Sequence, residues 1–274
     1  MAVCFVLTAS FGHAQTLPSE TDGNPNEVLV FEQTRVPRWL TETVVRAARV
    51  TGVDPAYLMA LADKESSLLP DNKARTSSAE GLFQFIESTW LEVLRRYGPK
   101  HGFVAEAEAI QIAAGRPVVS DETDRERLLR LRRDPYLSAL MAGEMISTHR
   151  EILAGKVERD PSFAELYVAH FLGVNGARRF VALLSDEPDN SAPKAFPRAA
   201  KANRALFFAS KADPQRKRKA LSVAEVQGRI AAMINKRVGR YASVRGEIGS
   251  GGVAHRGANA PYATSGPNLT LASP

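Results

Sequence analysis

The chain has 274 residues, 44% of them hydrophobic, which is enough for one medium-sized domain with a substantial core and appended segments. Its single cysteine, Cys4, excludes a disulfide framework and a cysteine-ligated metal site. No two of its five histidines stand at ligand spacing, so we expect neither a metal ion nor a cofactor. The net charge of +6 is unevenly spread, because residues 194–245 contain 14 Lys and Arg against two acidic residues.

The first 14 residues carry no charged side chain. Residues 2–7 form an apolar run, and Gly12-His13-Ala14 is an acceptable cleavage site. We interpret residues 1–14 as a signal peptide without its basic region, which predicts a periplasmic protein; an ordinary N-terminal strand is the alternative. The run is too short to cross a bilayer, so we expect no transmembrane segment.

The elements that follow are mostly helical. Residues 15–35 are polar and contain Pro and Gly, so we expect a linker. A helix is predicted after Pro37. A second one is predicted from Asp54, a suitable N-cap, and Pro55, which fits the first helical position. Residues 87–97 show helical periodicity again.

The second half of the chain repeats these signals. Asp134-Pro135 and Asp160-Pro161 each precede an apolar run with helical spacing. Prolines from 188 to 197 predict an extended connection, and Ser222 with Glu225 forms a capping box for a last helix. We therefore predict an all-α fold, with a helical domain over residues 36–185, a basic extension over 186–245 and a disordered tail over 246–274.

The basic extension, from Lys194 to Arg245, is a candidate binding site for an anionic envelope polymer such as the cell wall or phosphorylated lipid head groups. A solvated basic helix that binds nothing is the alternative. We do not expect a nucleic acid partner, because the N-terminus indicates export.

Glu65 is the candidate catalytic residue. It follows Leu61 by four residues and so falls on the apolar face of the second predicted helix, in the last turn before Pro70. Partial burial and the negative end of the helix dipole would both raise its pKa, as a general acid near neutral pH requires. The alternative is a side chain that frays into solvent at a helix end.

The residues around Glu65 resemble the lytic transglycosylase SLT domain family over roughly residues 40–180. The first block reads Ala-Leu-Ala-Asp-Lys-Glu-Ser-Ser over residues 60–67. The second reads Ser-Ser-Ala-Glu-Gly-Leu-Phe-Gln-Phe-Ile over residues 77–86 and is followed by Ser88-Thr89. Phe83 stands where the family usually has methionine. In the third block, Ala169-His170-Phe171 stands where the family has Ala-Tyr-Asn. The resemblance implies a lysozyme-like fold that acts on peptidoglycan glycan strands.

The resemblance also implies a mechanism with one carboxylate. Glu65 would protonate the glycosidic oxygen between N-acetylmuramic acid and N-acetylglucosamine, and then take a proton from the muramic acid C6 hydroxyl, closing a 1,6-anhydro ring. Carried over residue by residue, the resemblance also implies the substrate-binding candidates. Ser66 would offer a hydroxyl, Gly81 a close approach of the backbone and Gln84 an amide. Phe83 and Phe85 would form a wall of the cleft, and Tyr167 and His170 would be polar groups facing Glu65.

Alternatives stay open for these residues and for the function. Phe85 could belong to the core, and His170 could be a satisfied core histidine. A second carboxylate from Asp63 or Asp71 would favour hydrolysis, although Asp63 should point away from Glu65. The rival functions are a goose-type-lysozyme-like muramidase and a non-catalytic scaffold that binds the cell wall through the basic extension.

Overall fold

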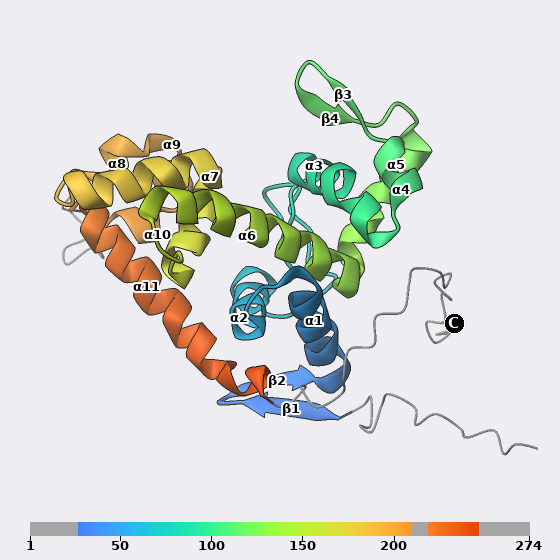
Figure 1. Ribbon diagram of the computed structural model, residues 1–274, viewed down its shortest axis with the longest axis horizontal. Coiled ribbons are helices and arrows are strands. Elements are labelled where there is room, and N and C mark those ends of the chain that lie inside the picture. Colours follow the sequence, from blue (N-terminus) through green and yellow to red (C-terminus); the bar gives the residue numbers. More distant parts are fainter. Residues whose placement is uncertain (1–26, 210–218, 247–274) are drawn as a thin grey trace, which may run out of the picture.

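The computed structural model describes residues 27–209 and 219–246, and its architecture is all-α, as predicted (Figure 1). The signal peptide, the start of the linker and the tail after Gly246 lie outside the described residues. The longer helices are α1 (Arg38–Thr51), α2 (Pro55–Ser66), α3 (Glu87–Tyr97), α5 (Glu122–Arg130), α6 (Pro135–Val157), α7 (Phe163–Asp186) and α11 (Val223–Arg240). Shorter ones are α4 (Val104–Glu108), α8 (Ala192–Ala195), α9 (Pro197–Ala202), α10 (Arg204–Phe207), η1 (Gly98–His101), η2 (Leu131–Arg133) and η3 (Ala242–Arg245).

Two small antiparallel hairpins accompany the helices. One pairs β1 (Val28–Phe31) with β2 (Thr34–Pro37), and the other pairs β3 (Gln111–Ala113) with β4 (Arg116–Val118). The first hairpin occupies the end of the segment that we predicted to be a linker. Phe31 packs against the ring of Tyr241, with 5.1 Å between the ring centroids, so this segment is part of the core.

Helix α2 lies at the centre of the core. All seven residues from Ala56 to Ala62 have 0% exposure, and a helix that is apolar on every side must be surrounded by other elements. Helices α1 and α11 pack against it. The predicted start is confirmed, because the Asp54 side chain accepts a hydrogen bond from the amide of Tyr57 at 2.9 Å and Pro55 follows it.

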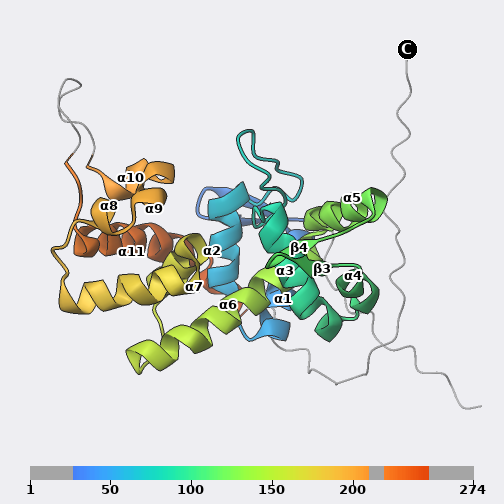
Figure 2. The same ribbon diagram turned by 90° about the horizontal axis from the view of Figure 1, so that it is seen from above.

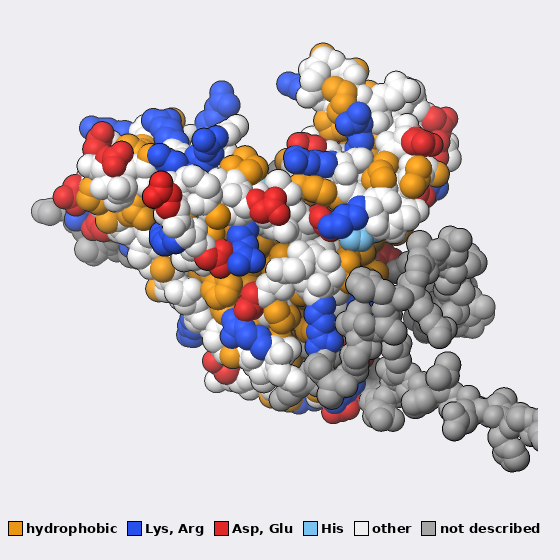
Figure 3. All heavy atoms as spheres, viewed as in Figure 1, with side chains coloured by type: hydrophobic (Ala, Val, Ile, Leu, Met, Phe, Trp, Pro, Cys, Tyr) orange, Lys and Arg blue, Asp and Glu red, His pale blue; other side chains and the backbone are white. Residues whose placement is uncertain are grey.

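The remaining elements form two groups on either side of α2 and the long α6 (Figures 1 and 2). One group contains α3, α4, α5 and the β3–β4 hairpin. The other contains α7 to α11. The space-filling view shows a hollow between these two groups on the upper side of the molecule (Figure 3).

The predicted boundary at residue 185 has no counterpart in the packing. Helix α11 packs against α7 and α2, and its buried stripe joins the same hydrophobic core: Val226, Ile230, Ile234 and Val238. Two cations of α11 and one of η3 pair with α2 or its N-cap. Arg240 lies 2.8 Å and Arg237 3.6 Å from the Asp63 carboxylate, and Arg245, in η3, lies 2.7 Å from that of Asp54. The described C-terminal residues therefore hold both ends of α2.

Two local predictions were wrong. Helix α7 begins at Phe163 with Ser162 as its cap, because Ser162 and Glu165 form a complete capping box, while Asp160 pairs with Arg150 at 2.6 Å instead. The proline-rich segment 188–197 is not extended, since it contains α8 and the start of α9. Proline at the first positions of a helix costs no hydrogen bond.

No helix among residues 27–209 and 219–246 is both long enough and apolar enough to cross a membrane.

Replacing Arg240 with alanine tests the contact between α11 and α2. The change leaves the partly buried Asp63 carboxylate with only the longer pair to Arg237, so we expect the free energy of unfolding to fall by about 1–3 kcal/mol. Urea denaturation measures it. Arg49→Ala, at an exposed position of α1, is the control and should change stability by less than about 0.5 kcal/mol. Equal stability of the two variants would contradict the assigned role of Arg240.

Candidate active site

Glu65 lies in the C-terminal turn of α2, where the helix leaves the core. The helix continues to Ser66 and ends at Ser67, which adopts the left-handed conformation (φ 55°). The Glu65 side chain is 18% exposed, so it has not frayed into solvent. His170 from α7 faces it, with 3.7 Å between His170 Nε2 and Glu65 Oε1. Two segments more than a hundred residues apart thus meet at this carboxylate.

The surroundings of His170 favour its neutral form. Burial lowers its pKa, although the charge of Glu65 acts in the opposite direction, and Lys64 lowers it further. Its Nδ1 is buried without a hydrogen-bond partner in the described part of the chain. Within the described ranges, one of the two ring nitrogens of His170 is therefore unpaired, which is uncommon for a buried polar atom.

Two tyrosines complete the surroundings of Glu65. Tyr167, one helical turn before His170, is 4% exposed, and its pKa is raised by burial and by the charge of Glu65. Tyr57 is fully buried, and its pKa is raised by burial and by the charges of Tyr167 and Glu65. Its hydroxyl has no partner within the described ranges. We did not predict Tyr57, although its spacing of eight residues from Glu65 places both on one face of α2.

A second carboxylate does not accompany Glu65 in the described contacts. Asp63 points away, as expected, and is paired with Arg237 and Arg240. Asp71 is exposed in the loop after α2.

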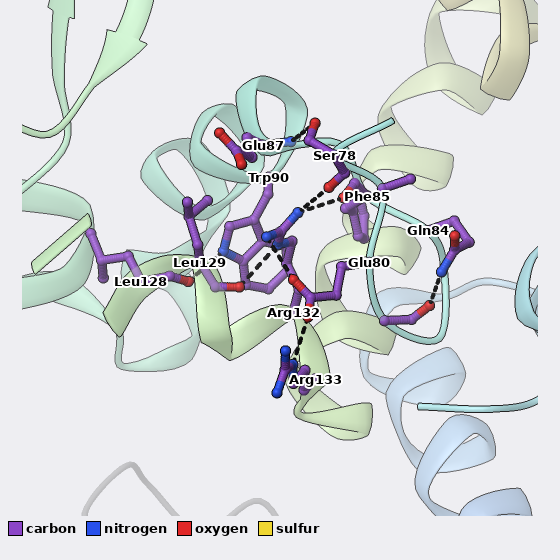
Figure 4. Close-up of polar contacts among 12 residues, drawn as sticks. Ser78, Glu80, Gln84, Phe85, Glu87, Trp90, Leu128, Leu129, Arg132 and Arg133 are labelled. Carbon is purple, nitrogen blue, oxygen red and sulfur yellow. Dashed lines mark hydrogen bonds and ion pairs between the residues drawn. The ribbon is translucent and has the colours of Figure 1, made fainter. Parts of the chain in front are cut away.

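The Gly81–Gln84 segment is shaped by the protein's own backbone (Figure 4). Gly81 has φ +85°, and a Cβ there would overlap the carbonyl oxygen of Arg132, so the close approach requiring glycine is to η2 and not to a ligand. Gln84 Nε2 donates to the carbonyl oxygens of Gly81 at 2.8 Å and Asn72 at 2.9 Å. These contacts assign both residues to loop geometry, which corrects the substrate contacts expected for Gly81 and for the amide nitrogen of Gln84.

The burial of three further residues changes the roles that we expected for them. Phe83 is 1% exposed and Phe85 4% exposed, so both belong to the core and neither forms a cleft wall. Ser66 is 3% exposed, and its hydroxyl donates to the carbonyl of Ala62 and accepts from the amide of Leu69. Ser66 therefore closes the end of α2, which replaces the predicted contact with a sugar.

An ion-pair network fixes this loop to η2 (Figure 4). The buried Glu80 carboxylate accepts from Arg132 Nη2 at 2.8 Å and from Arg133 Nε at 2.6 Å. Arg132, only 4% exposed, also donates to the carbonyls of Leu129, Ser78 and Phe85. Two of these carbonyls flank the Gly81–Gln84 segment, so Arg132 anchors it on both sides.

A groove of about 530 Å³ lies beside His170, between α3, α6 and the middle of α7. It corresponds to the hollow in Figure 3. Its polar lining comes from Thr89, Glu92, Arg96, Thr148, His149 and His170. Burial lowers the pKa of His149 to about 4, and the neighbouring His170 and Arg96 act in the same direction. The groove can thus hold a polar ligand against two neutral imidazoles.

A comparison with known protein families matches part of the chain. Residues 42–114 match the model of the Transglycosylase SLT domain. The matched stretch includes Glu65 and the Gly81–Gln84 segment. Tyr167 and His170 lie outside it, on α7.

Glu80→Ala tests the network around the loop. The buried Arg132 guanidinium would lose its counter-charge, so we expect the free energy of unfolding to fall by about 3–5 kcal/mol. Glu126→Ala is the control, because it removes a pair with Arg130 in which both side chains are more than half exposed; such a pair contributes about 0–1 kcal/mol. Chemical denaturation measures the free energy of unfolding of both variants. A similar small decrease in each would show that the buried pair does not anchor the loop.

His149 predicts a loss of stability in acid. In the unfolded chain its pKa returns to near 6.5, while the folded value is about 4, so between these pH values the unfolded state binds the extra proton. Stability should therefore fall as the pH drops from 6.5 towards 4, by at most about 3 kcal/mol from this residue. His149→Asn should make the free energy of unfolding less dependent on pH between 6.5 and 4. Some dependence should remain, because His170 contributes with the same sign. Thermal unfolding at pH 7 and 4.5 measures the difference; equal slopes for parent and variant would refute it.

Proposed function

We propose that this protein, whose residues 42–114 belong to the transglycosylase SLT domain family, is an exported peptidoglycan lytic transglycosylase. It would cleave the β-1,4 bond between N-acetylmuramic acid and N-acetylglucosamine without water and form 1,6-anhydro-N-acetylmuramic acid. The SLT domain itself supports peptidoglycan as the general target. The observation that carries the finer proposal is the partly exposed Glu65, which faces His170. The nearest carboxylate on the same helix, Asp63, forms ion pairs with two arginines.

One carboxylate is sufficient for this reaction. Protonated Glu65 donates its proton to the glycosidic oxygen as the bond to muramic acid C1 breaks. The resulting carboxylate then takes the proton of the C6 hydroxyl, whose oxygen attacks C1. Protons balance, because Glu65 ends protonated and no water is consumed. Hydrolytic glycosidases instead use a pair of carboxyl groups, and the contacts of Asp63 support the one-carboxylate reaction.

His170 and Tyr167 support this cycle as neighbours of Glu65. The 3.7 Å between His170 Nε2 and Glu65 Oε1 is longer than a hydrogen bond, so the two groups are close but not locked together. A neutral imidazole can donate an N–H to a carboxylate and can equally face its protonated form. Glu65 is therefore able to change charge without breaking a strong ion pair.

Two observations support the proposed export to the periplasm: peptidoglycan lies outside the cytoplasm, and the first residues of the sequence are apolar and uncharged. The scaffold hypothesis has weaker support. Three cations of the basic extension, Arg237, Arg240 and Arg245, form ion pairs with α2 and so serve the fold.

Digestion of purified sacculi tests the proposal. We expect soluble muropeptides lighter by one water than hydrolytic products, as read by mass spectrometry. Glu65→Gln should lower the rate of release at least about a hundredfold, because general acid–base catalysis typically contributes about 10²–10⁴-fold.

Glu151→Gln makes the same change at an exposed position of α6 and should keep the parent rate. Products of hydrolytic mass would favour the muramidase. Undiminished digestion by Glu65→Gln, with its fold verified by circular dichroism, would exclude Glu65 as the acid.

A further inference from the structure

A second cavity of about 460 Å³ lies between α7 and α9, outside the SLT match. Its floor is apolar and comes from Phe171, Leu172, Phe196 and Pro197. Arg198 and Asn203 supply the polar lining. The cavity therefore suits a ligand that combines apolar groups with negative charge.

This cavity adjoins the groove beside His170. Phe171 and Leu172 line both, and they directly follow His170 in the chain. Gly173 interrupts α7 at this point, with φ 71° and ψ 162°, so the helix changes direction between the two cavities. A ligand in the groove can thus extend a branch into the second cavity over the Phe171–Leu172 ridge.

The segment that supplies most of the lining of the second cavity carries only positive charge. Between residues 190 and 209 the chain carries Lys194, Arg198, Lys201 and Arg204 and no acidic residue. From α7, the Arg179 guanidinium lies over the ring of Phe196, 5.4 Å from its centroid. Figure 3 shows Lys and Arg side chains gathered over α8 and α9. These cations contribute little to holding a neutral sugar, so they indicate an anionic branch.

We propose that the second cavity binds the acidic stem peptide carried by the muramic acid residue of the strand being cleaved. The proposal rests on the proposed function, since it concerns the same substrate. Small side chains such as that of alanine fit against the aromatic floor, and the peptide carboxylates pair with Arg198. The protein would then prefer glycan strands that still carry their peptides.

The test compares peptide-bearing strands with strands stripped of peptide by an amidase. The quantity measured is the ratio of kcat/KM on the two substrates. We expect the parent to prefer peptide-bearing strands, and Arg198→Glu to lower the ratio at least about tenfold, as loss and reversal of a charge-assisted contact predicts. Ala202→Phe, which fills the cavity from an exposed position, should lower it as well.

Lys201→Glu is the matched control. It makes the same charge change on the same helix, at an exposed residue that does not line the cavity, and should leave the ratio within about twofold of the parent. An unchanged ratio in Arg198→Glu would contradict the proposed peptide site. An equal fall of the ratio in Lys201→Glu would also contradict it, because it would show that positive charge attracts the substrate without a specific contact.

If the parent cleaves neither substrate, the proposed function is wrong. A binding experiment then still tests whether the second cavity binds the peptide. A synthetic stem pentapeptide with free carboxylates is titrated into the parent, Arg198→Glu and Lys201→Glu, and binding is followed by NMR. Saturable binding that only Arg198→Glu loses supports the pocket. No binding to the parent, or equal binding by all three, overturns it.

Discussion

The complete burial of α2 is the constraint on which the rest of the structure depends. A helix with seven consecutive fully buried residues cannot lie on a surface, so α1 and α11 have to enclose it. Side chains can then emerge only at the ends of the helix, and its C-terminal turn is one of them. Glu65 occupies that turn, and its position is set by packing along the whole length of the helix. Ion pairs from α11 and η3, far away in sequence, hold the same helix at Asp63 and at its N-cap Asp54.

The loop after α2 is a second rigid unit, and its residues serve the fold more than a ligand. Glu80, Gly81 and Gln84 all bind parts of the protein itself: two arginines, a carbonyl of η2 and two loop carbonyls. A loop whose polar groups are satisfied internally can keep a fixed shape without a bound ligand.

The basic C-terminal region divides into two parts with different physical roles. Cations on α11 and η3 form ion pairs with carboxylates of α2 and its N-cap, and partial burial strengthens each pair. Cations on α8, α9 and α10 remain at the surface beside an apolar cavity. Net charge alone could not separate these roles, because it does not distinguish an arginine facing an aspartate from one facing solvent.

Local patterns in the sequence were sufficient for the helical fold, the caps at Asp54 and Ser222, and the candidate Glu65, since each depends on neighbours within a few residues. Only the tertiary structure decided which side chains face Glu65, that Phe83 and Ser66 are buried, and that α11 belongs to the core. Those outcomes depend on contacts between segments a hundred or more residues apart. Periodicity shows that a residue is on an apolar face, but the packing partner determines whether that face lines a groove or the core.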